Sequence, residues 1–426
     1  MTKKQRVAVL GSGIAGLSAA WIFSKHHEVC LYEKASKLGL GQKGVDISTR
    51  EGNKRIDVPI RVFSSIYYPK LHALCQYLNV PLRYLNNDSS FSDHMGRSYF
   101  RYFNLSLKDR TFTYILPKLR FLPWMTIFLP DYFKLKKDLS GKTYRINFTD
   151  KVFGDYLEAR RYSLQFKKEF LIPVFSAIAT CSEKEILNFP ANMILDLLSV
   201  FLETSPMKRW TGGTTALETA LAETIQQIKF ETVAHQIRQL EHGIEIRDSQ
   251  GNISVYDQVI IGTQANQAAK LIENIPELSH DKSLLELIPY AQTEMMVHQD
   301  EDVMPRNKKD WAAVNYQLTE QHDLPKASIW INRSEPDFKG IDTQYFQTLN
   351  PEKDYRGAIK KVKFSRPICN LESFEAMKEI RHRQLSDKQR KVHFVGSYLA
   401  DKLPLLENGV TSAMEVGEKF GIPLEF

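Results

Sequence analysis

Cysteine is scarce in this chain. Only four of the 426 residues are cysteines: Cys30, Cys75, Cys181 and Cys369. None stands in a Cys-x-x-Cys pair or at a ligand spacing from a histidine. The sequence therefore predicts neither a metal site nor a disulfide framework.

Long hydrophobic runs are also missing. No stretch of about 18 uncharged apolar residues occurs, so a membrane-spanning helix is not expected. The first ten residues lack the apolar core of a signal peptide. These two absences favour a cytoplasmic location.

A strong excess of one charge is absent too. The chain has 57 basic and 50 acidic side chains, with a formal net charge of +7. Over this length the excess suits an anionic partner or a membrane surface and does not indicate nucleic-acid binding. Hydrophobic residues make up 43% and charged residues 25%, which excludes a largely disordered chain. The length suits two packed domains.

The N-terminus carries a glycine motif between a predicted strand and a predicted helix. Residues 6–10 are typical of a short buried strand, and a helix rich in small residues follows the motif. This order is the one that a dinucleotide-binding βαβ unit requires. Its glycines permit a tight turn, close approach of a pyrophosphate and close helix packing. The predicted phosphate contacts are Gly11, Ser12, Gly13, Ile14, Ala15 and Gly16.

A second predicted strand, residues 28–32, runs directly into Glu33. Glu33 comes 22 residues after Gly11, close to the ~20 expected of the acid that binds ribose hydroxyls. A carboxylate would repel the 2′-phosphate of NADP, so NAD and FAD both remain open on this motif.

The end of the chain offers a second helix terminus. Residues 391–396 are typical of a buried strand ending in glycine, and Asn408-Gly-Val410 begins a small-residue helix. A flavin needs a second helix N-terminus near its ring, whereas NAD does not. An ordinary terminal strand–helix unit is the alternative.

Between these ends, residues 210–263 alternate helix and strand patterns. A Trp-Thr-Gly-Gly-Thr turn at 210–214 precedes a predicted amphipathic helix over 216–228, and strands are predicted over 243–247 and 259–261. The nucleotide domain is therefore predicted to consist of residues 1–90, 206–275 and 386–426. The substrate domain would then consist of two inserts, 91–205 and 276–385.

Taken together, these segments resemble the FAD-dependent amine-oxidase-like superfamily. The closest resemblance is to bacterial NAD/FAD-binding flavoproteins associated with cyclopropane and modified fatty-acid metabolism. It runs over nearly the whole chain. Segments that carry it include Tyr68-Pro69, Asn188-Phe-Pro190, His298-Gln-Asp300, Trp311–Tyr316 and Thr348–Pro351. The fold it implies is α/β: a GR2-type FAD-binding Rossmann-like domain with an inserted substrate domain of mixed or antiparallel sheet plus helices.

The resemblance also implies roles for single residues. The glycine turn would hold the pyrophosphate, Glu33 the adenosine ribose and the Val233 backbone the adenine. Further cofactor contacts would come from Lys34, Gly41, Thr263, Gly396, Asn408, Gly409 and Val410. The chain departs from the family pattern in three places: Leu40 between two glycines, Pro59 after Asp57-Val, and Leu406 before the terminal acid.

The first insert is aromatic and helical in pattern. Its segment 112–137 contains seven aromatics, three prolines and five basic residues against one acid. Three interpretations stay open: a cap over a hydrophobic substrate, a peripheral contact with a membrane surface, or a packed core with solvated lysines. The expected partner is a hydrophobic, lipid-like small molecule, and the oligomeric state is left open.

The second insert is predicted to form an antiparallel sheet below a substrate cavity. His298 and Asp300 share a strand face and could suggest a dyad or metal pair, although a structural role is favoured without a third ligand. Trp330 and Asn332 are likewise expected on one strand face. With Tyr68 they are the predicted substrate contacts.

The leading hypothesis is an FAD-dependent oxidoreductase that takes hydride from a substrate C–H to flavin N5 on a fatty-acyl or similar lipid substrate. A double-bond isomerase of a fatty acid would use the same architecture. An amine oxidase and a non-catalytic flavin- or lipid-binding scaffold also stay open. No catalytic side chain is predicted, because the cofactor would carry the chemistry.

Overall fold

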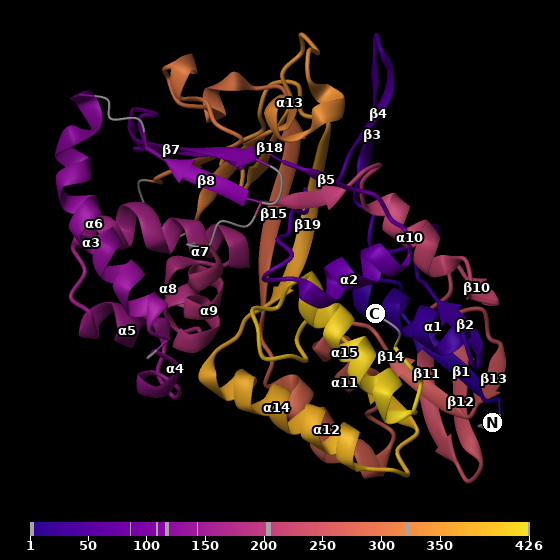
Figure 1. Ribbon diagram of the computed structural model, residues 1–426. Helices are drawn as coiled ribbons and strands as arrows, with labels where there is room; N and C mark the ends of the chain where they lie inside the picture. The colour runs from indigo at the N-terminus through magenta and orange to yellow at the C-terminus, as the bar shows by residue number, and fades with distance from the viewer. Residues whose placement is uncertain are drawn as a thin grey trace.

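The computed structural model describes residues 4–424, apart from 86, 108–109, 116–118, 143, 202–205 and 320–323. Figure 1 shows three regions: a strand–helix layer that includes both chain ends, a long-stranded sheet beside it, and a group of helices at the left. The two expected parts of an α/β fold, a parallel sheet and a mixed sheet, are both present.

The parallel sheet contains five strands in the order β10-β2-β1-β14-β20. Their bounds are β1 Arg6–Leu10, β2 Glu28–Tyr32, β10 Gln227–Lys229, β14 Gln258–Ile261 and β20 Val392–Phe394. Every neighbouring pair is parallel, as expected of a doubly wound sheet.

Helices cover both faces of this sheet because side chains alternate along each strand. Val7 and Val9 pack with one set of helices, and Ala8 and Leu10 pack with the other. The first set is α1 Ile14–Ser24, α10 Thr214–Ala222 and α15 Leu406–Lys419. The second is α11 Ala265–Leu271, α12 Ser279–Glu286 and α14 Leu371–Ser386, with the meander β11 Ala234–Leu240, β12 Gly243–Asp248 and β13 Ile253–Tyr256.

The helix predicted over 216–228 was too long. Helix α10 ends at Ala222, and residues 227–229 form β10, the edge strand that pairs with β2. The helical pattern continued because Ile228 stays in phase with the buried positions of α10, and tertiary pairing overrides that local signal.

The second sheet has eight strands in the order β19-β15-β18-β17-β16-β6-β7-β8. Only β16 and β6 run parallel; the remaining neighbours are antiparallel. The bounds are β6 Ser89–Ser92, β7 Ser98–Leu107, β8 Arg110–Tyr114, β15 Tyr290–His298, β16 Val314–Gln317, β17 Lys326–Trp330, β18 Phe346–Leu349 and β19 Lys360–Pro367. The first insert therefore begins with strands rather than helices, a correction of the sequence expectation for 91–114.

A helical group packs on β7 through aromatic rings. The ring centroids of Phe100 and Trp124 are 4.3 Å apart, and those of Trp124 and Phe128 are 4.5 Å apart. The helices are α3 Leu122–Ser140, α4 Tyr144–Asn147, α5 Phe153–Ala159, α6 Leu164–Phe166, α7 Ile172–Ala179, α8 Glu183–Leu187 and α9 Ala191–Phe201. None of the helices in the described ranges has both the length and the apolar character needed to cross a bilayer.

Four short pieces join the two sheets. They are the hairpin β3 Val45–Thr49 with β4 Gly52–Ile56, the pair β5 Leu82–Tyr84 with β9 Lys208–Trp210, helix α2 Pro69–Tyr77 and helix α13 Ile331–Ser334. The hairpin and Asp57–Ile60 place a chain segment directly against the second sheet, since Val58 and Ile60 share a core with Met295 and Val297 of β15.

Candidate functional site

The predicted cofactor residues lie at the carboxyl ends of neighbouring parallel strands. Gly11 follows β1, Glu33 follows β2, Thr263 follows β14 by two residues and Gly396 follows β20 by two. Ligands of doubly wound sheets bind at this edge, where the strand order reverses. Strand β1 lies between β2 and β14, so Gly11 is central among these ends.

The three motif glycines differ in what surrounds them. Gly11 has φ +97°, and a Cβ there would lie 3.1 Å from the Gly262 carbonyl oxygen. A Cβ at Gly16 would lie 1.8 Å from the Gly11 carbonyl oxygen. Gly13 has no atom within 4 Å of such a Cβ, and its backbone is extended. The protein's own packing thus requires Gly11 and Gly16, whereas Gly13 leaves open space at the start of α1.

That open space faces unsatisfied donors. Gly13 is the N-cap of α1 and makes no side-chain cap, so the first N–H groups of the helix have no capping acceptor. Such a terminus attracts phosphate.

Glu33 is buried at the end of β2 and organises the turn. One carboxylate oxygen accepts hydrogen bonds from the Ser12 backbone N–H, 3.0 Å away, and from the Ser12 hydroxyl; the second oxygen accepts from the Ala35 N–H at 2.9 Å. The Ser12 hydroxyl oxygen in turn accepts from the Gly39 N–H at 2.7 Å. Neighbouring Lys34 is exposed to solvent.

The next loop is fixed on α10. Glu218 accepts a hydrogen bond from the Gly41 N–H at 2.7 Å, and a Cβ at Gly41 would meet the same carboxylate at 2.7 Å. Burial raises the pKa of Glu218 above its usual range. Leu40 is buried in the core that includes α1. The departure from a glycine pair is therefore accommodated by packing the loop inward.

Val233 offers less than the resemblance implies. Its N–H donates to the Ser249 hydroxyl at 3.0 Å, and its carbonyl accepts from the Ser249 N–H at 2.8 Å. Both backbone groups are thus engaged within the turn, and only the half-exposed side chain is free to contact an adenine.

The first turn of α15 and the loop before it each hold a buried polar atom without a partner among the described residues. The amide nitrogen of Asn408 donates to the carbonyls of Ser397 and Lys402, while its oxygen has no partner among the described residues. The Tyr398 hydroxyl is also buried without a partner in that set. Buried polar atoms are almost always hydrogen-bonded, so these two indicate a position for an external group.

Helix α15 also lies directly against the glycine turn. A Cβ at Gly409 would sit 2.7 Å from a methyl carbon of Ile14 and 3.4 Å from the Ala15 nitrogen. The structure therefore brings residues 11–16 and 408–410 together, and Val410 is buried in their shared core. A Cβ at Gly396 would meet the Tyr398 ring at 2.4 Å, so that strand end is closely packed as well.

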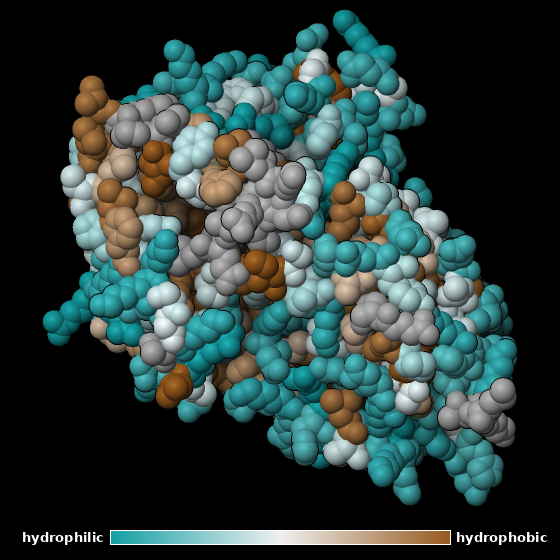
Figure 2. Space-filling view, in the orientation of Figure 1, coloured by the Kyte–Doolittle hydropathy of each residue, from teal (hydrophilic) through white to brown (hydrophobic). Residues whose placement is uncertain are grey.

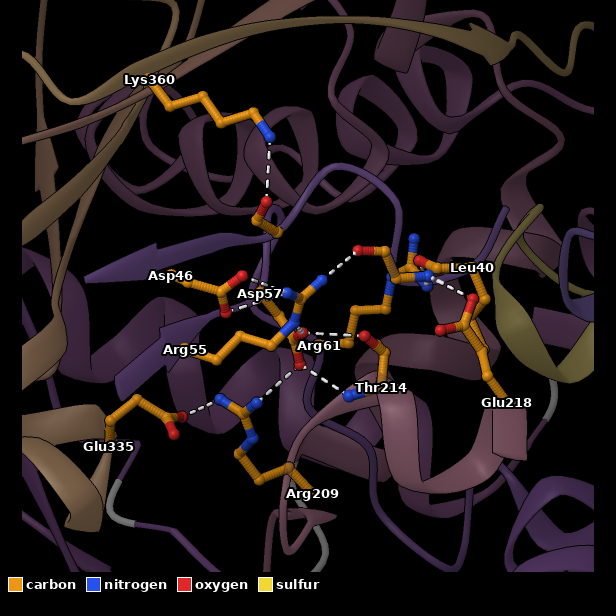
Figure 3. A network of polar contacts seen from close by, with 12 residues as sticks. Leu40, Asp46, Arg55, Asp57, Arg61, Arg209, Thr214, Glu218, Glu335 and Lys360 are labelled. Carbon is orange, nitrogen blue, oxygen red and sulfur yellow. Dashed lines mark hydrogen bonds and ion pairs between the residues drawn. The ribbon is translucent and has the colours of Figure 1, made fainter. Parts of the chain in front are cut away.

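Two arginines that sequence reasoning missed lie near this helix end. The Arg61 guanidinium donates to the Leu40 carbonyl at 3.1 Å (Figure 3), and burial, then the charge of Arg366, lower its pKa to about 10. Burial also lowers the pKa of Arg366, on β19. Neither guanidinium forms an ion pair with a described residue, and Arg366 has no hydrogen-bond acceptor there. The charges of Asp57 and Glu218 act in the opposite direction on the pKa of Arg61, whereas no carboxylate acts on Arg366. Two neighbouring like charges favour an anion beside them, above all beside Arg366.

The surroundings of Arg366 are apolar. A cavity of about 10 Å³, room for roughly one water, borders its side chain. The cavity walls are Ala179, Phe189, Pro367, Leu403, Pro404 and Leu405. Leu405 is the N-cap of α15, so Arg366 adjoins a helix N-terminus that also favours negative charge. Tyr68, a predicted substrate contact, lies near Arg366.

A buried ionic network anchors Arg61's segment (Figure 3). Asp57 accepts hydrogen bonds from the Arg209 guanidinium and from the N–H and hydroxyl of Thr214, each at 2.8 Å. Arg209 also pairs with Glu335 beyond α13. The side chain of Gln347 donates to the Asp57 carbonyl and accepts from the Ile60 N–H. These contacts fix the segment 57–61 between the two sheets.

Trp330 and Asn332 are not brought to this place. Strand β17 ends at Trp330, whose ring packs on Trp311, on the sheet face opposite to the Met295 and Val297 side chains that contact Ile60. Asn332 lies in α13, where its amide bonds the carbonyls of Phe338, Ile341 and Thr343 and the N–H of Tyr345. The expectation of one shared strand face was wrong, because the strand ends between them.

His298 has a structural environment. Its Nδ1 accepts from the Asp300 N–H, so its Nε2 carries the proton and donates to the Thr348 hydroxyl at 2.8 Å. Burial lowers its pKa to about 4, which keeps the ring neutral. Within the described ranges, no three His, Cys, Asp or Glu side chains are grouped so as to hold a metal.

A faint signal for the missed arginines exists in the sequence. Each is a single charge inside an apolar run, Val58–Phe63 and Phe364–Ile368. A lone arginine in a buried segment requires a partner. The sequence did not reveal that the two lie together, since about 300 residues separate them.

Comparisons with known proteins agree with the fold described above. Residues 9–78 match the family model of an NAD(P)-binding Rossmann-like domain. No curated protein matches the chain. Three solved structures match nearly its whole length at low identity. Putrescine oxidase bound to putrescine matches at 13% identity, 99% of this chain and 100% of that one, with TM-score 0.65. Cyclohexylamine oxidase from Brevibacterium oxydans matches at 13% identity over 98% of this chain and 100% of that one, with TM-score 0.63. The CLA-producing fatty acid isomerase from P. acnes matches at 14% identity over 99% of each chain, with TM-score 0.65. The chain therefore contains a nucleotide-binding Rossmann-like domain within an amine-oxidase-like fold.

Proposed function

We propose that the protein is an FAD-dependent oxidoreductase whose substrate has a hydrophobic body and an anionic head, as a fatty-acyl chain does. The observation that carries the proposal is the convergence of open and unpaired groups at one sheet edge. Gly13 leaves room beside a helix N-terminus, and Asn408 and Tyr398 hold buried polar atoms without partners among the described residues.

These residues fit an extended flavin nucleotide. The α1 N-terminus and Gly13 would hold the pyrophosphate, Glu33 the ribose, and the first turn of α15 the flavin end. NAD leaves the unpaired atoms of Asn408 and Tyr398 unexplained, because it has no flavin ring to place at a second helix terminus. When bound, FAD supplies a two-electron acceptor for hydride from a substrate C–H bond.

The chain's own residues would position the substrate and exclude water. Arg61 and Arg366 would bind a carboxylate, since guanidinium groups pair with carboxylates in a fixed geometry. Tyr68 would contact the hydrocarbon part. Forming a double bond would transfer one hydride to the cofactor and release one proton from the neighbouring carbon, and no described side chain is assigned as the acceptor of that proton.

The same pair of cations argues against an amine substrate, whose positive charge they would repel. A double-bond isomerase remains a second candidate. It would use the same anion site, and the whole-chain likeness to a fatty acid isomerase structure favours it to that extent.

The test begins with the purified full-length protein. Absorbance near 450 nm and mass spectrometry of released small molecules report the cofactor. Anaerobic titration with a long-chain fatty acid should bleach the absorbance if the reaction is oxidation. Analysis of double-bond positions in the product detects isomerisation. An alkylamine of the same length should fail to bleach it.

A variant pair separates substrate binding from cofactor binding. Arg366→Met should raise the fatty-acid concentration needed for half-bleaching at least about tenfold, from the loss of a charged hydrogen bond. Lys363→Met, an exposed change on the same strand, is the matched control. Bleaching by the amine but not the acid, or a colourless folded protein that ignores FAD in calorimetry, contradicts the proposal.

A further inference from the structure

Helix α3 is apolar on two sides. Its inner side packs Trp124, Phe128 and Leu135 into the core. Its outer side exposes Leu122 and, three turns later, Phe133, which is 61% exposed. A surface helix that packs on one side usually has charged residues on the opposite side.

The apolar surface extends beyond α3 itself. Leu119, in the preceding short helical turn, is 87% exposed, and Leu164 of α6 is 66% exposed. Helix α6 lies beside α3, because the Ser163 N–H donates to the Asp131 carboxylate. We call this surface the α3 face; it comprises Leu119, Leu122, Pro123, Ile127, Pro130, Phe133 and Leu164. In Figure 2 brown atoms gather at the upper left, over the place of α3 and α6 in Figure 1.

The charges near this face are arranged unequally. Both acids of α3 have partners within the protein: Asp131 accepts from the N–H of Ser163, the N-cap of α6, and Asp138 pairs with Arg160 and accepts from the Tyr162 hydroxyl. Lys136 and Lys137, by contrast, are exposed in the next turn of the helix and pair with no described residue. The outer side of α3 therefore presents apolar residues followed by free positive charge.

We infer that the α3 face binds the surface of an anionic lipid bilayer, with its apolar residues in the headgroup region and its lysines at the phosphates. From Leu122 to Phe133 the helix rises about 16 Å, enough to lie along the interface. Lysines at the edge of an apolar helix face are attracted by anionic lipids. Isolated exposed apolar residues are normal, whereas a contiguous set of them marks an interaction surface.

A membrane fits this surface better than a protein partner does. The adjacent charge has one sign, which complements a uniformly anionic surface. The inference does not depend on the proposed chemistry, since it concerns binding alone.

The experiment measures co-flotation of the full-length protein with vesicles. Phosphatidylcholine vesicles containing one quarter phosphatidylglycerol should bind the protein, and pure phosphatidylcholine should bind it more weakly. Leu122→Ser/Phe133→Ser should weaken the partition at least about tenfold through lost apolar burial. Lys136→Glu/Lys137→Glu should weaken it about thirtyfold and abolish its dependence on salt.

The matched control is Ile253→Ser/Val255→Ser, which removes two exposed apolar residues from β13. Circular dichroism melting shows that each variant is folded. Three results overturn the inference: vesicle binding unchanged by the α3 variants, no binding to anionic vesicles, or a concentration-dependent dimer that Phe133→Ser dissolves. The last result would assign the face to a protein contact.

Discussion

Gly13 and Gly16 belong to one turn, yet the fold needs only one of them to be glycine. Gly16 lies so close to the Gly11 carbonyl that any Cβ would clash, whereas Gly13 is open and has an ordinary extended backbone. The strand–turn–helix order predicted both glycines, because the motif itself encodes close packing and close ligand approach. The sequence alone did not show which glycine serves which role, because the roles depend on the atoms that surround each glycine in the fold.

We expect Gly13→Asp to fold and to lose its nucleotide. Aspartate is a favourable N-cap for α1, so flavin-free protein should melt at an equal or slightly higher temperature, while its charge repels the pyrophosphate. Gly16→Ala should instead destabilise the protein by about 3 kcal/mol or more through overpacking. Thermal unfolding of flavin-free protein and calorimetry with FAD give the two readouts. Normal FAD affinity in Gly13→Asp would contradict the placement of the phosphates.

At the scale of elements, α1 and α15 fit together through a regular repeat. Gly409 and Gly417 are eight residues apart and face Ile14 and Ile22, which are also eight residues apart. About two helical turns separate the two glycines and also the two isoleucines, so each isoleucine of α1 packs against one glycine of α15. The helices were predictable from their small residues and apolar pattern, but this register was not. Strand β10 was missed because three residues of an edge strand carry too little pattern.

Gly417→Ala should destabilise this helix pair. The added Cβ would lie 2.7 Å from a methyl carbon of Ile22, and we expect a loss of about 1–3 kcal/mol in the free energy of unfolding. Glu418→Ala changes the exposed neighbouring position and should have little effect. Denaturant unfolding of both variants measures the difference. Equal free energies of unfolding for the two variants would contradict this, because α1 and α15 would then accommodate the added Cβ without loss of stability.

On the scale of the whole molecule, one buried network connects the parts that sequence reasoning assigned to different domains. Arg209 contacts Asp57 near the hairpin and Glu335 in the second insert, and all three side chains are buried. The α/β class and the mixed inserted sheet were predictable from the motif order and the resemblance. This network was not, because three charges 152 and 126 residues apart show no local signal.

Arg209→Met should cost about 3–5 kcal/mol of stability, because it leaves the buried Asp57 without its close cation and leaves Glu335 paired with Arg83 alone. Arg97→Met breaks an exposed pair with Asp93 instead and should cost at most about 1 kcal/mol. Urea unfolding of the two variants measures the difference. Losses of similar size in both variants would show that the buried network contributes no more than a surface pair.

The parallel sheet takes its fifth strand from residues 392–394, although its first strand is residues 6–10. During synthesis the ribosome must therefore release nearly four hundred residues before β20 can pair with β14. Until then the hydrophobic edge of β14 stays uncovered, and the groups contributed by α15 do not yet exist. Binding of a nucleotide that needs both α1 and α15 should accordingly wait until α15 has been synthesised, and shorter chains should depend on chaperones to shield that edge.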